Sequence, residues 1–351
     1  MEGIQIFGFY LISLYETYVP IYQCNDEYCI YLFHVQKMQK TNFSTIILLG
    51  FQTEDTYRAL LFILLVVIYC VTLFGNVLII TLVSHSKSLH SPMYYFLTQL
   101  SIYDIMLTTD IVPNMLHIVL HDEATISLIG CITQFYLFGS AEEGECFILM
   151  VMSYDRYLAI CKPLHYMCIM NNTCCLNLII VSWVLSFSLS FIVTVMMGDL
   201  QFCGPNIIDH FFCDFNPILQ LSCSDISNIL MTSVLLGVFD LVCPLFLIIL
   251  SYAYIVSVVS KISTSTGRWK SFSTCSSHLT VVCIFYGTLT ATYMLPNKGR
   301  LLIISKILSM LYTVIIPFLN PFIYSLKNND IKEALIKKLH LFNVFVQQSI
   351  Q

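Results

Sequence analysis

The residues of this chain that could do chemistry are carboxylates and amides lying inside long apolar runs. Asp104, Glu145, Asn76 and Asn320 each have mostly apolar neighbours. A charged group in such surroundings is costly unless it faces a bundle interior and finds partners. These four residues therefore predict a polar core cluster, with Asn76, Glu145 and Asn320 as partners of Asp104. One interpretation is a purely structural knot that holds helices together.

A second group of acidic residues also lies inside apolar runs. Glu142, Glu143 and Asp240 have no basic residue near them in sequence, and Lys306 is the only nearby candidate partner. Unpaired buried carboxylates are protonated, hydrated or neutralised by a cation. The last alternative predicts an amine ligand.

Enzyme chemistry is not indicated by any sequence motif. The chain contains no His-Glu-x-x-His, no Gly-x-Ser-x-Gly and no phosphate-binding glycine loop. We therefore expect neither an active site nor a catalytic metal.

Composition sets the kind of solvent that surrounds the protein. Of the 351 residues, 57% are hydrophobic and only 11% are charged, too few charges to cover a water-facing surface. A net charge of −5 offers no basic footprint for nucleic acid. The class that remains is an all-α membrane protein.

Runs of about 20 apolar residues, the length that crosses a bilayer, indicate a seven-transmembrane helix bundle. The second, third and seventh runs contain ionisable residues and are weaker by hydropathy. The predicted spans are 59–83, 93–119, 133–158, 176–197, 229–259, 279–295 with a polar lead-in from 273, and 301–326.

The distribution of lysine and arginine orients the bundle. Most of them flank the side of the carboxyl terminus, and the long loop between spans four and five has none, which places the amino terminus outside. The domains expected are an extracellular segment 1–58, a seven-transmembrane bundle 59–326 and a cytoplasmic tail 327–351. Asn42 is a glycosylation acceptor on the outer side. Met38 is an alternative start, which leaves two alternatives: residues 1–37 are absent from the working protein or dispensable in it, or they are a functional part of it.

Four cysteines fall on the outer side, and they leave three disulfide pairings open. They are Cys131, Cys203, Cys213 and Cys223. A zinc site is the alternative, because His210 and Cys213 have a His-x-x-Cys spacing, although an oxidising exterior favours disulfides.

A set of sequence phrases follows the order of the spans. These are GN at 75–76, LHSPMY at 89–94, LSIYD at 100–104, MSYDRYLAIC at 152–161, SY at 251–252, KSFSTCSSHL at 270–279 and PFLNPFIY at 317–324. Together they resemble the vertebrate olfactory receptors, a branch of the rhodopsin-like G-protein-coupled receptors, over about residues 42–328.

The resemblance implies a signalling mechanism and assigns roles to residues of this chain. Asp155 pairs with Arg156 at rest and releases it to a stimulatory heterotrimeric G protein, which raises cAMP. The bland alternative is that Arg156 is a snorkelling basic residue. The remaining switch residues implied are Tyr157, Tyr252, Asn320, Pro321 and Tyr324.

The resemblance also implies the pairings Cys131–Cys213 and Cys203–Cys223. It makes the cluster at Asp104 and Glu145 a sodium or water site, with no other cofactor, and places the receptor in the plasma membrane. A small-molecule odorant would bind in the outer half of the bundle. The expected ligand contacts, for which ordinary helix packing is the alternative, are Phe138, Glu142, Asp240, Tyr286, Thr290 and Tyr293.

Two further hypotheses stay open on the sequence. One is a rhodopsin-like receptor for a non-odorant molecule, and the other is a secondary transporter, against which the absence of a repeat between the halves argues. After span seven, residues 330–339 have apolar residues at helical spacing beside lysines. This pattern predicts a short amphipathic helix on the inner membrane face.

Overall fold

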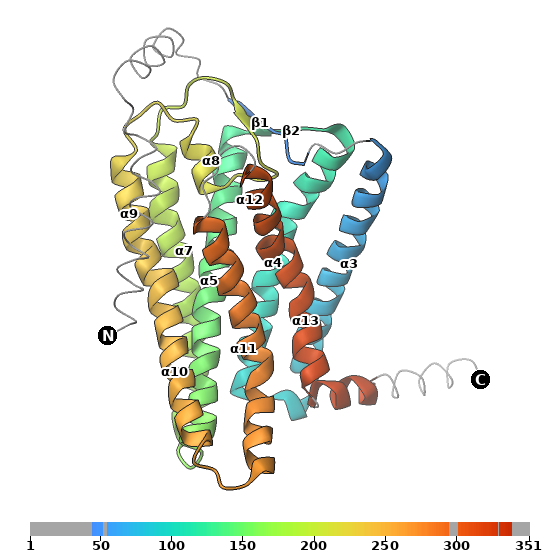
Figure 1. The fold of residues 1–351 in the computed structure, drawn as a ribbon, viewed down its shortest axis with the longest axis vertical. Coiled ribbons are helices and arrows are strands. Elements are labelled where there is room, and N and C mark those ends of the chain that lie inside the picture. Colours follow the sequence, from blue (N-terminus) through green and yellow to red (C-terminus); the bar gives the residue numbers. More distant parts are fainter. Residues whose placement is uncertain (1–43, 52–54, 295–300, 329, 339–351) are drawn as a thin grey trace, which may run out of the picture.

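The fold is seen in a computed structural model that describes residues 44–51, 55–294, 301–328 and 330–338. The segment 1–37 and the glycosylation acceptor Asn42 lie outside these residues. The chain forms a bundle of long helices with a small sheet at one end (Figure 1).

Each of the seven predicted spans is helical, which confirms the fold class. Two of the spans are built from consecutive segments that include a π-helical turn. The spanning helices are α3 (Asp55–His85), α4 (Pro92–His121), α5 (Leu128–Cys161), α7 (Asn172–Gly198), α9 with η2 and α10 (Ser227–Gly237, Val238–Val242, Cys243–Val259), α11 (Ser265–Met294), and α12 with η3 and α13 (Leu301–Met310, Leu311–Ile315, Ile316–Lys327).

The helices are longer than the apolar runs that predicted them. The largest difference is in α11, which begins at Ser265, whereas the apolar run begins at 279. The intervening residues are polar but compatible with a helix, so the helix extends beyond the apolar segment on the cytoplasmic side. A hydropathy pattern marks where lipid begins and leaves the helix end undefined.

Only some of the helices could cross a membrane by length and composition alone. Among the described residues these segments are Thr56–His85, Asn172–Gly198, Ser227–Val259 and Leu302–Ser325. The prediction that the seventh span is weak by this criterion was therefore wrong, because its single lysine is outweighed by apolar neighbours. The sixth span is the weaker one, since the first half of α11 is polar.

The outer faces of the helices carry large apolar side chains. Phe74 on α3, Phe191 on α7 and Phe246 on α10 are 70%, 57% and 62% exposed. Exposed apolar surface on this scale would aggregate in water. In a bilayer the same side chains face lipid, and the helices satisfy their own backbone hydrogen bonds.

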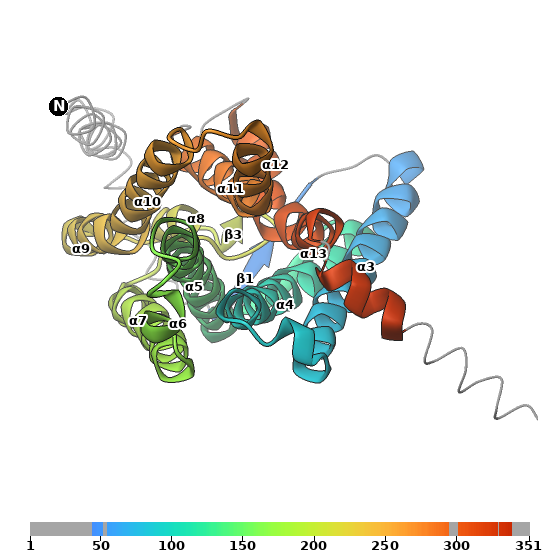
Figure 2. The ribbon, with the colours of Figure 1, turned by 90° about the horizontal axis from the view of Figure 1, so that it is seen from below.

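Helix α5 lies at the centre of the bundle and contacts α4, α7, α10 and α11; Figure 2 shows it enclosed by its neighbours. Close approach to α4 depends on Gly144, where an added Cβ would lie 2.3 Å from the ring of Tyr103. The Tyr103 ring stacks on Trp183 of α7, with ring centroids 4.4 Å apart. The three helices therefore interlock at one level.

We expect Gly144→Ala to destabilise the receptor by about 1–3 kcal/mol, the usual cost of forcing atoms into a packed core. The ring of Tyr103 cannot retreat because Trp183 lies against it. Gly287→Ala in α11 is the matched control, since no atom lies within 4 Å of its added Cβ. The measurement is thermal unfolding of the purified receptor; equal unfolding temperatures for the two variants would contradict the packing argument.

Two π-helical turns were not predicted, and each precedes a proline. The turn η2 ends two residues before Pro244, and η3 ends two residues before Pro317. Proline has no N–H to donate and its ring crowds the preceding turn. A wider π-turn is one way in which a helix accommodates the disruption, and such turns are frequent at functional sites.

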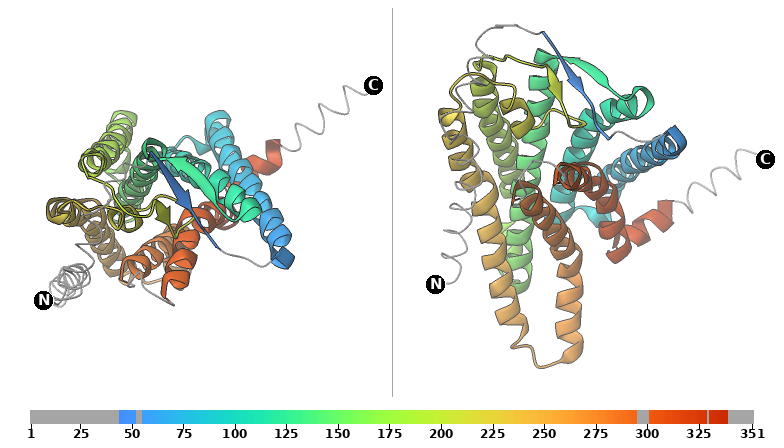
Figure 3. Two further views of the ribbon diagram at one scale, coloured as in Figure 1. Left: turned by 90° about the horizontal axis from the view of Figure 1, so that it is seen from above. Right: turned by 45° about the horizontal axis from the view of Figure 1, so that its top comes forward.

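A three-stranded sheet covers the outer end of the bundle, and it too was not predicted. Strand β1 (Thr45–Leu48) pairs antiparallel with β2 (Ala124–Ser127) and parallel with β3 (Ile207–Ile208). Seen from above, the sheet lies across the helix ends (Figure 3). It joins the amino-terminal segment to the first and second outer loops. Strands of two to four residues carry too little alternation to be found in a sequence.

The segment after α13 turns away from the bundle, as Figure 1 shows. Residues 330–338 are helical, with Ile331 and Ala334 buried and Ile336 exposed. The Tyr94 hydroxyl at the start of α4 donates to Asp330 Oδ2 at 2.8 Å. This confirms the predicted helix and shows how its start is attached to the bundle.

Candidate functional site

The cytoplasmic end of α5 holds an ion pair between adjacent residues. Arg156 donates to Asp155 Oδ2 from Nη2 at 2.6 Å and from Nε at 3.1 Å. The Asp155 side chain is fully buried. The predicted resting pair is therefore present.

Tyr166, which the sequence analysis missed, is a second partner of Asp155. It lies on the short helix α6 (Tyr166–Ile169) in the second inner loop, and its hydroxyl donates to Asp155 Oδ1 at 2.7 Å. Burial first, and then the neighbouring carboxylate, raise the pKa of Tyr166 above its usual value, so the hydroxyl keeps its proton. Both carboxylate oxygens of Asp155 thus accept hydrogen bonds, one from Arg156 and the other from Tyr166.

His278 is another residue that sequence reasoning passed over, although it lies in a quoted phrase. Its Nε2 is 3.0 Å from the Leu149 carbonyl of α5, and its Nδ1 is 2.7 Å from the Tyr252 hydroxyl of α10. Because a carbonyl only accepts, Nε2 carries the proton and Nδ1 accepts from tyrosine. The imidazole therefore links α11 to both α5 and α10.

The other predicted switch residues do not hydrogen-bond Arg156 in this structure. Tyr252 is engaged with His278, and the buried hydroxyl of Tyr324 has no hydrogen-bond partner within the described segments. Tyr157 packs among the rings of Tyr154 and Tyr254. Any approach of Tyr252 or Tyr324 to Arg156 requires a different arrangement of the helices.

The polar core cluster forms around Asp104. Asn320 Nδ2 donates to Asp104 Oδ1 at 2.9 Å and to Oδ2 at 3.2 Å. Glu145 interacts electrostatically with Asp104, and neither of its buried oxygens has a hydrogen-bond partner among the described residues. Asn320 is therefore a direct partner of Asp104, and Glu145 lies near Asp104 without a hydrogen bond to it.

Asn76 is the exception, and the prediction that it partners Asp104 directly was wrong. Its Nδ2 donates to the Thr72 carbonyl at 3.1 Å and to the Pro317 carbonyl at 3.3 Å. Pro321 and the π-turn explain this: the disrupted ladder of the seventh span leaves carbonyls without intrahelical partners. Asn76 satisfies one of them instead.

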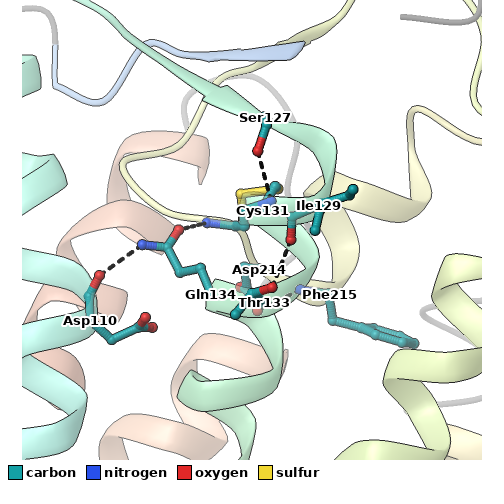
Figure 4. The surroundings of a disulfide bond; sticks show 10 residues. Asp110, Ser127, Ile129, Cys131, Thr133, Gln134, Asp214 and Phe215 are labelled. Atoms are coloured by element: carbon teal, nitrogen blue, oxygen red, sulfur yellow. Dashed lines mark hydrogen bonds between the residues drawn. A yellow bond between two sulfur atoms is a disulfide. The ribbon is translucent and has the colours of Figure 1, made fainter. Parts of the chain in front are cut away.

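The outer cysteines form Cys131–Cys213 and Cys203–Cys223, with Cα–Cα distances of 5.5 and 5.9 Å. The zinc alternative was wrong, because three of its ligands are consumed in disulfides. Figure 4 shows Gln134 hydrogen-bonded beside the first disulfide. Its Oε1 accepts from Cys213 N at 3.0 Å and its Nε2 donates to the Asp110 carbonyl at 2.9 Å.

Lys306 joins the second outer loop and the amino-terminal segment to the seventh span. Its Nζ lies 2.5 Å from Asp209 Oδ1 and donates to the Gly50 carbonyl at 2.7 Å. Gly50 has φ +58°, a left-handed conformation that glycine tolerates. Lys306, the only candidate partner for the acidic residues of the bundle, is therefore engaged elsewhere. The second outer loop supplies a closer carboxylate.

His210 lies next to this ion pair, and its ring nitrogens are buried without hydrogen-bond partners in the described part of the chain. It packs on Phe211 and Phe212. Burial, helped by the charge of Lys306, lowers its pKa to about 3. Asp214 behaves oppositely: burial raises its pKa to about 6, although a hydrogen bond from Phe215 N opposes the change.

We expect His210→Gln to make the receptor less sensitive to acid. Below pH 6.5 an unfolded histidine binds a proton that the folded His210 refuses, so this residue's stability contribution falls by about 1.4 kcal/mol at pH 5.5. Asp214 has the reverse sign, because between pH 3.8 and 6 its folded form binds more protons. Thermal unfolding at pH 7.5 and 5.5 tests this. The variant should lose less stability than the wild type on acidification; an equal loss would exclude His210 as the cause.

The predicted ligand contacts lie on α5, η2 and α11. Phe138 is buried against Phe212 of the second outer loop and Tyr312 of η3, with ring centroids 5.0 and 6.0 Å away. Tyr286 is buried, Thr290 is half-buried one turn further out, and the side chain of Tyr293 falls outside the described part. Glu142 interacts electrostatically with Tyr312 and with Cys146.

These features define a class of protein before any relative is considered. A seven-helix bundle with an Asp-Arg pair at the inner end of its third span is the arrangement seen, and the structure is similar to squid rhodopsin with a TM-score of 0.66. That match covers 83% of this chain and 88% of the other at 18% identity, so it shows the fold alone.

The family model described as "Olfactory receptor" matches residues 65–341, and the chain belongs to the olfactory receptor family. Human olfactory receptor 11L1 is 45% identical over 86% of this chain and 94% of its own length. Human olfactory receptor 11A1 is 44% identical over 84% and 93%. Mouse olfactory receptor 5P55 is 45% identical over 86% and 98%. The protein is thus a multi-pass G-protein-coupled receptor and neither an enzyme nor a transporter.

Proposed function

We propose that this receptor binds small volatile odorants in the outer half of its bundle and activates a stimulatory heterotrimeric G protein at the plasma membrane, raising cAMP. Family membership supports the receptor role. The observation that carries the coupling is the Asp155–Arg156 pair at the inner end of the central helix. Because Asp155 holds the guanidinium of Arg156 at this end, Arg156 can exchange that contact for one with the G protein.

The linkage at His278 suggests how a ligand signal reaches that pair. Ligand contacts in the outer half lie on α5, η2 and α11, while His278 ties α11 to α5 further in. Movement of the inner half of α11 away from α5 must break the bond between His278 and the Leu149 carbonyl. Tyr252 stays bonded to His278 in that movement, and the unbonded hydroxyl of Tyr324 is available to approach Arg156. Pro244 and Pro321, which interrupt the helical hydrogen bonding, mark the points where we propose that the helices rearrange.

A sodium ion at Asp104 and Glu145 is part of the same proposal. The residues fit a hard cation, which prefers oxygen ligands. Both Glu145 oxygens and the Oδ1 atoms of Asn320 and Asn76 are buried without hydrogen-bond partners in the part of the chain described. Such a cation would balance the charge of this cluster at rest.

The outer sequon at Asn42 is the proposed glycosylation site.

The test is a cAMP reporter assay in cells expressing the receptor, with a panel of amines, acids, esters and aldehydes. We expect a subset of the panel to raise cAMP in a concentration-dependent manner, and cells without the receptor to give no response. Responses only through an inhibitory or calcium-linked G protein would overturn the stimulatory assignment. A receptor for a non-odorant ligand would instead respond to involatile analogues and ignore the whole panel.

A further inference from the structure

Two carboxylates lie near each other in the outer half of the bundle, one on α5 and the other in the fifth span. Glu143 lies on α5, and Asp240 lies in the π-turn η2; their charges interact. Glu143 Oε1 accepts from Ser190 of α7 at 3.1 Å, while its buried Oε2 has no hydrogen-bond partner among the described residues. One carboxylate is thus half-satisfied, and the second adds negative charge beside it.

No basic side chain of the described residues neutralises this pair. The ion pairs seen there are Arg58–Asp122, Arg156–Asp155 and Lys306–Asp209. Lys306, the single basic residue in the outer half of the seventh span, is held by Asp209 and Gly50. Two like charges in a low-dielectric site are strongly unfavourable unless a cation or protons accompany them.

A separate observation places a ligand-binding group at the same point. Tyr286 of α11 is 5% exposed, and its hydroxyl has no hydrogen-bond partner within the described segments. It interacts electrostatically with Asp240, and it lies within weak hydrogen-bonding reach of the Cys146 thiol, one turn of α5 inward from Glu143. A buried hydroxyl normally finds a partner. Tyr286 therefore brings a hydroxyl from a third helix close to Asp240, with a thiol, which is a weak hydrogen-bonding group, as its neighbour.

We infer that the receptor takes an organic ammonium ligand, a protonated amine whose nitrogen sits between Asp240, the Tyr286 hydroxyl and the free oxygen of Glu143. An ammonium group has three hydrogens to donate, and this arrangement offers three oxygens from three helices. The inference rests on the proposed function only in treating this region as the ligand site. Asp240 lies in the π-turn η2, and such turns are frequent at functional sites, which agrees with this assignment.

The experiment uses matched amines and alcohols on the full-length receptor. The probes are pentylamine, cyclohexylamine and 2-phenylethylamine beside 1-pentanol, cyclohexanol and 2-phenylethanol, at pH 7.4 where the amines are protonated. Binding is measured as the rise in unfolding temperature of the purified receptor in lipid nanodiscs, and signalling is measured as cAMP in cells. Each measurement compares the wild type with Asp240→Asn, Glu143→Gln and Tyr286→Phe. The control is Asp225→Asn, an exposed carboxylate that accepts hydrogen bonds from Ser227.

At least one amine should stabilise the receptor more than its alcohol does. Asp240→Asn should weaken that amine about 10- to 150-fold, the range expected for a lost charge-assisted hydrogen bond. The alcohols should change little, and Asp225→Asn should change neither class. Tyr286→Phe and Glu143→Gln should give smaller losses confined to amines.

The two readouts separate this inference from the proposed function. Stabilisation by amines without a cAMP response would support the ammonium site and reject stimulatory coupling. A cAMP response equal for amines and alcohols, or one that Asp240→Asn reduces equally for both, would overturn the ammonium site and leave the receptor role standing. Absence of any amine-specific stabilisation would also overturn it. The carboxylates would then be protonated or hydrated packing groups in a receptor for neutral odorants.

Discussion

Replacing Arg156 with alanine is expected to reduce agonist-stimulated cAMP to about a tenth or less, because a charge-assisted contact made in the active state is worth at least a decade. In the resting structure Arg156 bonds only Asp155 among the described residues, so its proposed signalling contact lies with the G protein. The variant has a second effect, since it strands a fully buried carboxylate. Loss of one partner from a buried pair costs about 3–5 kcal/mol, which will lower surface delivery.

A double variant separates the two effects. Asp155→Asn combined with Arg156→Ala removes the stranded charge while an amide oxygen can still accept from Tyr166. At equal surface density, measured by antibody labelling of an amino-terminal tag, the double variant should remain silent. Asp155→Asn alone frees the arginine and should raise cAMP without ligand. Normal signalling by the double variant would make Arg156 a snorkelling residue with no role in coupling.

Loss of the Cys131–Cys213 bridge is expected to have the largest effect on the outer end. The bridge spans 82 residues of sequence, for which chain entropy alone gives about 4.5 kcal/mol. Cys131→Ser or Cys213→Ser should therefore abolish surface expression or the ligand response. The bridge also positions Phe212, which packs on Phe138 beside the proposed ligand site.

The second disulfide provides the control. Cys203–Cys223 spans only 20 residues, about 3.3 kcal/mol by the same reasoning, and it lies wholly within one loop. Cys203→Ser should therefore reduce surface expression less than Cys131→Ser does. Surface labelling and cAMP responses of the variants, compared at matched expression, measure this. Wild-type behaviour of Cys131→Ser would show that the sheet and the contacts of Gln134 hold the loop without the bridge.

The sequence was informative where a single physical pressure acts. Lipid demands long apolar runs, so the seven spans could be found; burial demands partners for carboxylates, so the contact of Asp104 with Asn320 could be anticipated. The pair at Asp155 came from a family phrase. Tyr166 could not be found in the same way, because it approaches Asp155 through a short loop helix whose path is set by tertiary packing.

Two of the differences have a related cause. Asn76 was expected to contact Asp104, and Lys306 was the only candidate partner for the acidic residues of the bundle; each instead donates to a backbone carbonyl, and Lys306 also pairs with Asp209. The Gly50 carbonyl is presented by a left-handed turn and the Pro317 carbonyl by a proline-disrupted helix. Backbone acceptors do not vary with residue type, so a search for complementary side chains overlooks them. The π-turns and the short sheet escape for a similar reason, since both depend on neighbours far away in sequence.

The position of strand β1 has a consequence for biosynthesis. Its parallel partner Ile207 is translated long after Ile47, and the Lys306 ammonium that grips Gly50 comes 256 residues later than its acceptor. At about 5–20 residues per second, the nascent chain waits roughly 10–50 s for that lysine. Strand β1 can pair with β2 once two spans have been made and with β3 once four have been made, but the Gly50 carbonyl lacks its lysine until the seventh span. The outer end of the receptor is therefore completed by a late contact, which forms only when the seventh span has been made.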